Sequence, residues 1–195
     1  MDPVKAISSD RDQARKLADT NADICFLALA DANGRASVRT LVLRDISDNY
    51  FTLFLNKTSP KWTAFEEGTG HEMLIWYASV LRQYRVSGKL EELDQSIVSQ
   101  NWKNRPDGSK YLDSVYEELG NQSSPIDSRH ILTDKISQLK QSMDLETMQA
   151  PAAVSGLKLT ADRIDVLDLN HQDRIHDRQL YTYDGGTWTT QVLIP

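Results

Sequence analysis

The chain has little that would hold it together covalently or anchor it in a membrane. It contains a single cysteine, Cys25, in 195 residues, so an intrachain disulfide is impossible, and in the apolar run 24–30 a small buried hydrophobe is its expected role. No apolar run approaches the ~20 residues that a membrane helix needs, and residues 1–5 lack the apolar core of a secretory signal. We therefore expect a protein of the reducing cytoplasm with no membrane partner.

Several kinds of site are also missing. A formal net charge of -6 argues against a general nucleic-acid binder and means that any anion site must come from locally clustered cations. The histidines have no ligand spacing with one another or with Cys25, so no metal site is expected. The sequence also lacks a glycine-rich phosphate loop, a G-x-S-x-G elbow and a Cys–His dyad.

What is present is a series of short β-rich runs with one helical interruption. Strands are expected at 24–30, 37–44, 50–56, 73–79, 82–93, 154–159, 163–169, 174–183 and 187–193. Helices are expected after caps at residues 8–10, at Ser59 with Pro60 in the first turn, and three times between 94 and 143, with caps at Asp94 and Asp127. This order predicts an α+β fold: an antiparallel β-barrel in one domain, 1–195, with a helical insert at about 94–143 and a C-terminal strand segment at about 152–195.

Cationic side chains gather around the second and third expected strands. Arg39 lies within the run 37–44, Arg44 closes it, and Lys61 stands in the first turn of the helix that follows the next strand. Lysine near a helix N-terminus adds charge to free N–H groups, which favours a phosphate pocket. Strand alternation puts the two arginines on opposite faces unless a bulge intervenes. Solvated cations at strand ends are the alternative.

Two further polar groupings are notable. Arg105 and Ser109 around a Pro-Gly turn resemble a small anion clamp, although charged turn residues are usually just solvated. Strand alternation would place Arg174, His176 and Arg178 on one face. A histidine between two arginines should favour its neutral form, which suits hydrogen bonding beside an anionic ligand. A solvated edge strand is the alternative.

Taken together, these motifs resemble the pyridoxamine 5′-phosphate oxidase family, flavin enzymes of the FMN-binding split-barrel fold. The resemblance covers roughly residues 24–195 in the family order. Residues 37–44 resemble R-x-V-L-L-K, 56–61 resemble T-N-x-x-S-R-K, 82–88 resemble R-Q-V-R-x-x-G, and 105–109 resemble the R-P-x-x-S of S-R-P-x-x-S. The most specific match is 174–178, followed by Trp188 and a terminal Leu-Ile-Pro, which resembles R-L-H-D-R…W…L-x-P.

The resemblance implies a set of site residues. The FMN phosphate would be held by Arg39, Lys61 and Ser123, and the rest of the flavin by Gln83, Gln122 and Arg178. Backbone lining the flavin would come from Thr40, Leu41, Val42, Leu43, Phe54 and Leu55. A substrate phosphate would contact Arg44, Asn101, Arg105 and Ser109, and the catalytic pair Arg174 and His176 would hold the substrate ring over the flavin.

The resemblance also implies an activity. Such a protein would be an FMN-dependent oxidase acting on CH-NH2 of pyridoxamine 5′-phosphate, or on pyridoxine 5′-phosphate, to give pyridoxal 5′-phosphate, as a homodimer with flavin at the subunit interface. The chain departs from the family pattern at Pro60 (for Arg), Arg44 (for Lys), Asn101 (for Tyr) and Leu167 (for Trp). The alternatives are an FMN oxidoreductase of the same fold acting on another small substrate, and a non-catalytic flavin-binding protein.

Overall fold

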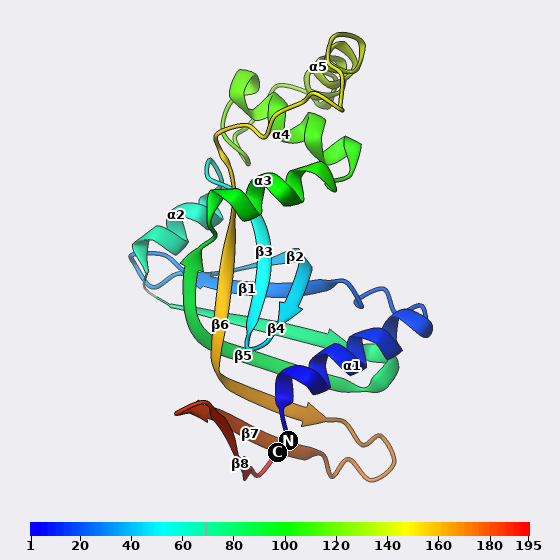
Figure 1. Ribbon diagram of the computed structural model, residues 1–195, viewed down its shortest axis with the longest axis vertical. Coiled ribbons are helices and arrows are strands. Elements are labelled where there is room, and N and C mark those ends of the chain that lie inside the picture. The colour runs from blue at the N-terminus through cyan, green and yellow to red at the C-terminus, as the bar shows by residue number, and fades with distance from the viewer. Residues whose placement is uncertain (69) are drawn as a thin grey trace.

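In the part of the chain that the structure describes, eight antiparallel strands form one sheet, and six of them close into a barrel (Figure 1). The computed structural model describes residues 1–68 and 70–195, without the side chain of Glu117. The strands are β1 Ile24–Ala30, β2 Ala36–Ser47, β3 Tyr50–Asn56, β4 His71–Tyr77, β5 Arg82–Glu92, β6 Val154–Asp168, β7 Asp177–Asp184 and β8 Thr187–Val192. Their order is β3-β2-β1-β4-β5-β6-β7-β8, and a β3–β6 pairing closes the barrel. The expected barrel is confirmed.

The long strand β6 belongs to the barrel at one end and to a smaller hairpin sheet at the other. It pairs with β3 over Val154–Thr160 and with β7 over Arg163–Asp168, while β5 follows it along almost its whole length. The prediction of two separate strands, at 154–159 and 163–169, is wrong because one strand runs through both segments. The β5–β6 ladder continues past a register shift at Ser87/Gly88. The close approach of the two strands there requires glycine, because a Cβ at residue 88 would lie only 2.0 Å from the Thr160 carbonyl oxygen.

The barrel interior is a continuous apolar cluster. Phe51, Leu53, Tyr84 and Ile164 are fully buried in it. Cys25 is also fully buried, and burial raises the pKa of its thiol to about 12, so that it stays protonated at neutral pH. The expected role as a small buried hydrophobe is confirmed.

Helices flank the barrel at two places and extend it at one end. They are α1 Pro3–Lys16, α2 Pro60–Glu67, α3 Gln95–Lys103, α4 Asp107–Leu119 and α5 Arg129–Ser142, with a 3-10 turn η1 Ala78–Val80. Helices α3 to α5 form a lobe beyond one end of the barrel (Figure 1) around a second core that contains Val98, Trp102 and Val115. Their bounds match the expected helical insert, while the division of residues 1–195 into a single domain stays a prediction. Within the described ranges, no helix combines the length and apolarity that crossing a membrane requires.

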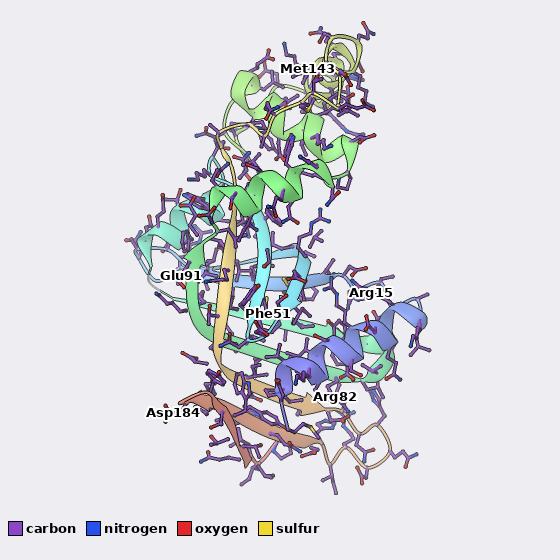
Figure 2. All side chains as sticks on the ribbon, in the orientation of Figure 1. Arg15, Phe51, Arg82, Glu91, Met143 and Asp184 are labelled. Atoms are coloured by element: carbon purple, nitrogen blue, oxygen red, sulfur yellow. The ribbon has the colours of Figure 1, made fainter. Side chains whose placement is uncertain are left out.

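Helix α1 corrects one expectation. Its cap is Asp2, which accepts from Val4 N at 2.9 Å, rather than the run 8–10. Asp10 lies inside the helix and points inward, where it is buried and accepts from Arg82 at 2.8 Å and from the Tyr84 hydroxyl. Figure 2 shows Arg82 beside α1. Local sequence does not distinguish an aspartate that caps a helix from one that pairs with a distant strand.

Candidate functional site

Strands β2 and β3 separate at the point where the cationic residues gather. Strand β2 pairs with β1 from Ala36 to Val42, but with β3 only from Leu43 to Ser47. All of β3 pairs with β6, and over its far half, Phe54–Asn56, β6 is the partner that the described strands provide. Within the described parts of the chain, no strand therefore covers the β3-facing edge of β2 at residues 38–42. The backbone expected to line the flavin, at Thr40, Leu41, Val42, Leu43, Phe54 and Leu55, lies on these two diverging strands.

The two arginines of β2 face different cationic partners. A register shift between Leu43 and Asp45 interrupts the alternation at Arg44. Burial lowers the pKa of Lys61, and the positive charge of Arg39 lowers it further. Burial also lowers the pKa of Arg44, to which the charge of Arg105 adds. One strand thus contributes to two separate cation pairs.

The first pair, Arg39 and Lys61, lies beside an open cavity of about 1030 Å³ that Arg39, Pro60, Gln122 and Ser123 help to line. Hydrogen bonds hold the 120–125 loop against the start of α2. Lys61 Nζ donates to Gln122 Oε1 at 3.2 Å, and Gln122 N donates to Thr58 Oγ1 at 3.1 Å. The cap of α2 is Ser59, as expected, and its Oγ accepts from Trp62 N at 3.4 Å.

The donor set of this cavity fits the phosphate end of FMN. Among the side chains that the structure describes, neither Arg39 nor Lys61 has a carboxylate within the 4.0 Å of an ion pair, although Asp31 and Glu67 line the same cavity. Two close positive charges, one of them half-buried, are stabilised when an anion lies between them. Pro60 brings no donor of its own, and the further cation that lines this cavity is Arg35.

The second pair, Arg44 and Arg105, lines a small cavity of about 10 Å³ with Asn101. Arg105 also forms an ion pair with Asp113 at 2.6 Å, and Asn101 Nδ2 donates to its own helix at Ile97 O, 3.0 Å away. The structure therefore brings together three of the four residues expected to contact the substrate phosphate, and it adds a carboxylate that sequence reasoning missed. Ser109 lies in the first turn of α4 and does not line this cavity.

The third group lies where β5, β6 and β7 run side by side. Gln83, Leu167 and Arg178 are register partners across the three strands. Arg178 donates to both oxygens of the buried Asp165, which also accepts from Arg85. Burial alone would raise the pKa of Asp165, but the hydrogen bond from Arg178 and the charge of Arg85 outweigh it and hold that pKa below its usual range. Sequence reasoning also missed Asp165.

Arg174 and His176 lie in the loop before β7, so the expected strand from 174 is wrong at its start. Arg174 has φ of 63°, and the local turns are held by Asp173 Oδ1, which accepts from Ile175 N, and by Asn170 Oδ1, which accepts from Gln172 N. Such side-chain bonds to the backbone compete with strand pairing. His176 Nδ1 accepts from Asn170 N at 3.1 Å, which leaves Nε2 to carry the proton of a neutral ring.

Within one chain the first and third groups lie far apart. Helix α2 lies on the left of the barrel, and the connection between β6 and β7 lies at the lower right (Figure 1). Figure 2, in the same orientation, shows Arg82 of β5 near that lower-right side.

Among the residues that the structure describes, no group of His, Cys, Asp or Glu side chains is arranged to hold a metal ion.

A closed antiparallel barrel, whose second and third strands split around a cation pair, defines a split-barrel protein of the FMN-binding type. The family model described as pyridoxamine 5′-phosphate oxidase matches residues 11–143, and the chain belongs to this family. Membership supports an oxidoreductase with FMN as its cofactor.

The chain is also similar to individual proteins of known sequence or structure. A pyridoxine/pyridoxamine 5′-phosphate oxidase of Nostoc punctiforme is 28% identical over 187 residues, covering 95% of this chain and 84% of the relative. One from Acinetobacter baumannii is 29% identical over 170 residues, covering 87% and 76%. Among solved structures, PhzG from Burkholderia lata in complex with tetrahydrophenazine-1-carboxylic acid has a TM-score of 0.87 at 22% identity, with 100% and 93% covered. A pyridoxamine 5′-phosphate oxidase-related, FMN-binding protein from Nostoc punctiforme has a TM-score of 0.79 at 18% identity, with 98% and 96% covered.

Proposed function

We propose that the protein is an FMN-dependent oxidase that oxidises the amine- or alcohol-bearing carbon of a small anionic ring substrate. Pyridoxamine 5′-phosphate or pyridoxine 5′-phosphate, giving pyridoxal 5′-phosphate, is the first candidate. The observation that carries the proposal is the uncompensated cation pair of Arg39 and Lys61 where β2 and β3 separate.

In this proposal Arg39, Lys61 and Ser123 hold the FMN phosphate, and Gln122 orients Lys61 through its 3.2 Å hydrogen bond. Gln83, Gln122 and Arg178 contact the rest of the flavin, with Arg178 fixed in direction by Asp165. Bound there, FMN would supply the redox chemistry, taking a hydride from the substrate carbon and passing electrons to oxygen.

The substrate is held by chain residues at two ends. Its anionic group would contact Arg44, Asn101 and Arg105, with Ser109 from the first turn of α4. Arg174 and His176 would hold its ring, and His176 can donate from Nε2 because Nδ1 is occupied by Asn170 N. A fixed donor favours one orientation of the ring.

We also propose a homodimer in the cytoplasm. The Arg39 group and the Arg178 group lie on different sides of one chain, so a second copy would bring them around one flavin (Figure 1). Large apolar side chains are exposed on the surfaces concerned, including Val38, Val42, Ile175, Val192 and Ile194. Exposed apolar surface of this kind is typical of subunit interfaces.

A second candidate is the same flavin chemistry on a substrate without a phosphate. The ion pair between Arg105 and Asp113 favours it, because the carboxylate offsets one of the two positive charges expected to hold a phosphate.

The test is turnover. FMN-loaded protein is incubated with pyridoxamine 5′-phosphate in air, and the aldehyde product and peroxide are measured. Formation of both supports the first candidate. Bound flavin with neither product removes the first candidate and leaves another substrate or a non-catalytic flavin protein. Protein that purifies colourless and is not stabilised against heat by FMN contradicts the proposed function altogether.

A further inference from the structure

Asp113 pairs with Arg105, one of the residues that line the anion subsite together with Arg44 and Asn101. Its side chain is 6% exposed and lies 2.6 Å from the guanidinium of Arg105, whose side chain is 23% exposed. Burial raises the pKa of Asp113, and the charge of Arg105 opposes that rise. The pair is thus a feature of the interior and not a surface contact.

Only one of the two arginines in the subsite is in contact with a carboxylate. Among the described residues, Arg105 pairs with Asp113, whereas Arg44 has no carboxylate within 4.0 Å and is influenced only by the more distant charge of Asp23. The cavity that Arg44, Asn101 and Arg105 line measures about 10 Å³, which is room for about one water or one ligand oxygen. Arg105 Nε is buried and makes no hydrogen bond within the described chain, so one donor of its fork is unused.

These features fit a monoanion better than a dianion. A phosphate monoester carries about −1.5 to −2 charges at neutral pH and three acceptor oxygens. It would meet two guanidiniums, one of which is already paired with Asp113. A carboxylate carries one charge and can place a single oxygen in the cavity.

We propose that Asp113 is a specificity-determining residue that tunes this subsite to a carboxylate-bearing substrate and disfavours a phosphate ester. The inference rests on the proposed function, because it takes Arg44 and Arg105 as the substrate-anion residues. It names the class of substrate, and it favours the second candidate, a substrate without a phosphate, over pyridoxamine 5′-phosphate.

The test compares two ligands with the same ring and different anions, benzoate and phenyl phosphate, by calorimetric titration of the FMN-loaded protein at neutral pH. Wild-type protein is expected to bind benzoate more tightly. Asp113→Asn should shift the affinity ratio toward phenyl phosphate by about tenfold or more, because it removes a nearby buried charge. Asp107→Asn, which removes an exposed charge from the same helix, should leave the ratio unchanged.

Several outcomes would overturn the proposal. These are tighter binding of phenyl phosphate by the wild type, no benzoate binding at millimolar concentrations, or the same ratio in Asp113→Asn as in the wild type. If Asp113→Asn does not fold, the wild-type ratio alone decides. The flavin absorbance of each sample separates this test from the proposed function: loss of flavin counts against the FMN site, and retained flavin with an unchanged ratio counts against Asp113 alone.

Discussion

Arg178 and Asp165 form a two-point ion pair on neighbouring strands. Arg178 Nε lies 3.1 Å from Asp165 Oδ1, and its terminal nitrogen lies 2.8 Å from Oδ2. Asp165 lies on β6, is 2% exposed and also accepts from Arg85. Because it is held in this way, it fixes the direction in which the Arg178 side chain points. Bidentate geometry of this kind restricts a guanidinium more than a single contact does. We therefore propose that Asp165 positions Arg178 for its proposed contact with the flavin.

Asp165→Asn should lower FMN affinity by roughly tenfold and destabilise the fold by about 2 kcal/mol, since charge-assisted hydrogen bonds to two arginines are lost. Fluorescence titration with FMN and thermal unfolding measure the two effects. Asp162→Asn, which replaces an exposed carboxylate on the same strand by an amide, is the matched control. Similar losses in both variants would show that Asp165 has no special role.

Lys61 should make FMN binding weaken in alkaline solution. Burial and the charge of Arg39 lower the pKa of Lys61 in the free protein, so the ammonium is lost at a lower pH than the ordinary lysine value of about 10.4. Above that pH a phosphate must restore the proton, and FMN affinity falls as pH rises. Lys61→Arg, which stays charged, should remove this component. Parallel pH curves for the two proteins would contradict the assignment.

Arg174→Ala should slow turnover far more than it weakens FMN binding. Arg174 is exposed in the loop before β7 and is assigned to the substrate ring, not to the flavin. We expect a fall in kcat/KM of about 100-fold or more, with FMN affinity within about twofold of the wild type. The kinetics use whichever substrate the turnover test identifies. Equal losses in turnover and in FMN affinity would contradict the role.

Sequence alone located most of the fold because local signals are strong in this chain. Strands β1 and β3 were predicted to the residue, and the caps Ser59 and Asp94 were correct because each accepts from its own helix. The cap at Asp127 was one residue early, since α5 begins after Ser128. Such small errors at helix ends are usual.

What sequence could not supply is pairing between distant segments. Asp113 reads as an ordinary polar residue between Tyr111 and Val115, and only the fold places it against Arg105. Asp165 likewise has its partners, Arg85 and Arg178, on the two strands that lie on either side of it. In the segment 170–176, side-chain bonds to the backbone outweigh β propensity, so the alternation argument was wrong for Arg174 and His176.

The central claim is that Arg39 and Lys61 bind the phosphate of FMN, and the most direct test compares FMN with riboflavin, which has the same ring system without the phosphate. Equilibrium titration of the wild type should show FMN binding at least about 100-fold more tightly than riboflavin, and Arg39→Glu should remove most of that difference while riboflavin binding changes little. Equal affinities of the wild type for the two flavins, or an unchanged preference in Arg39→Glu, would contradict the account.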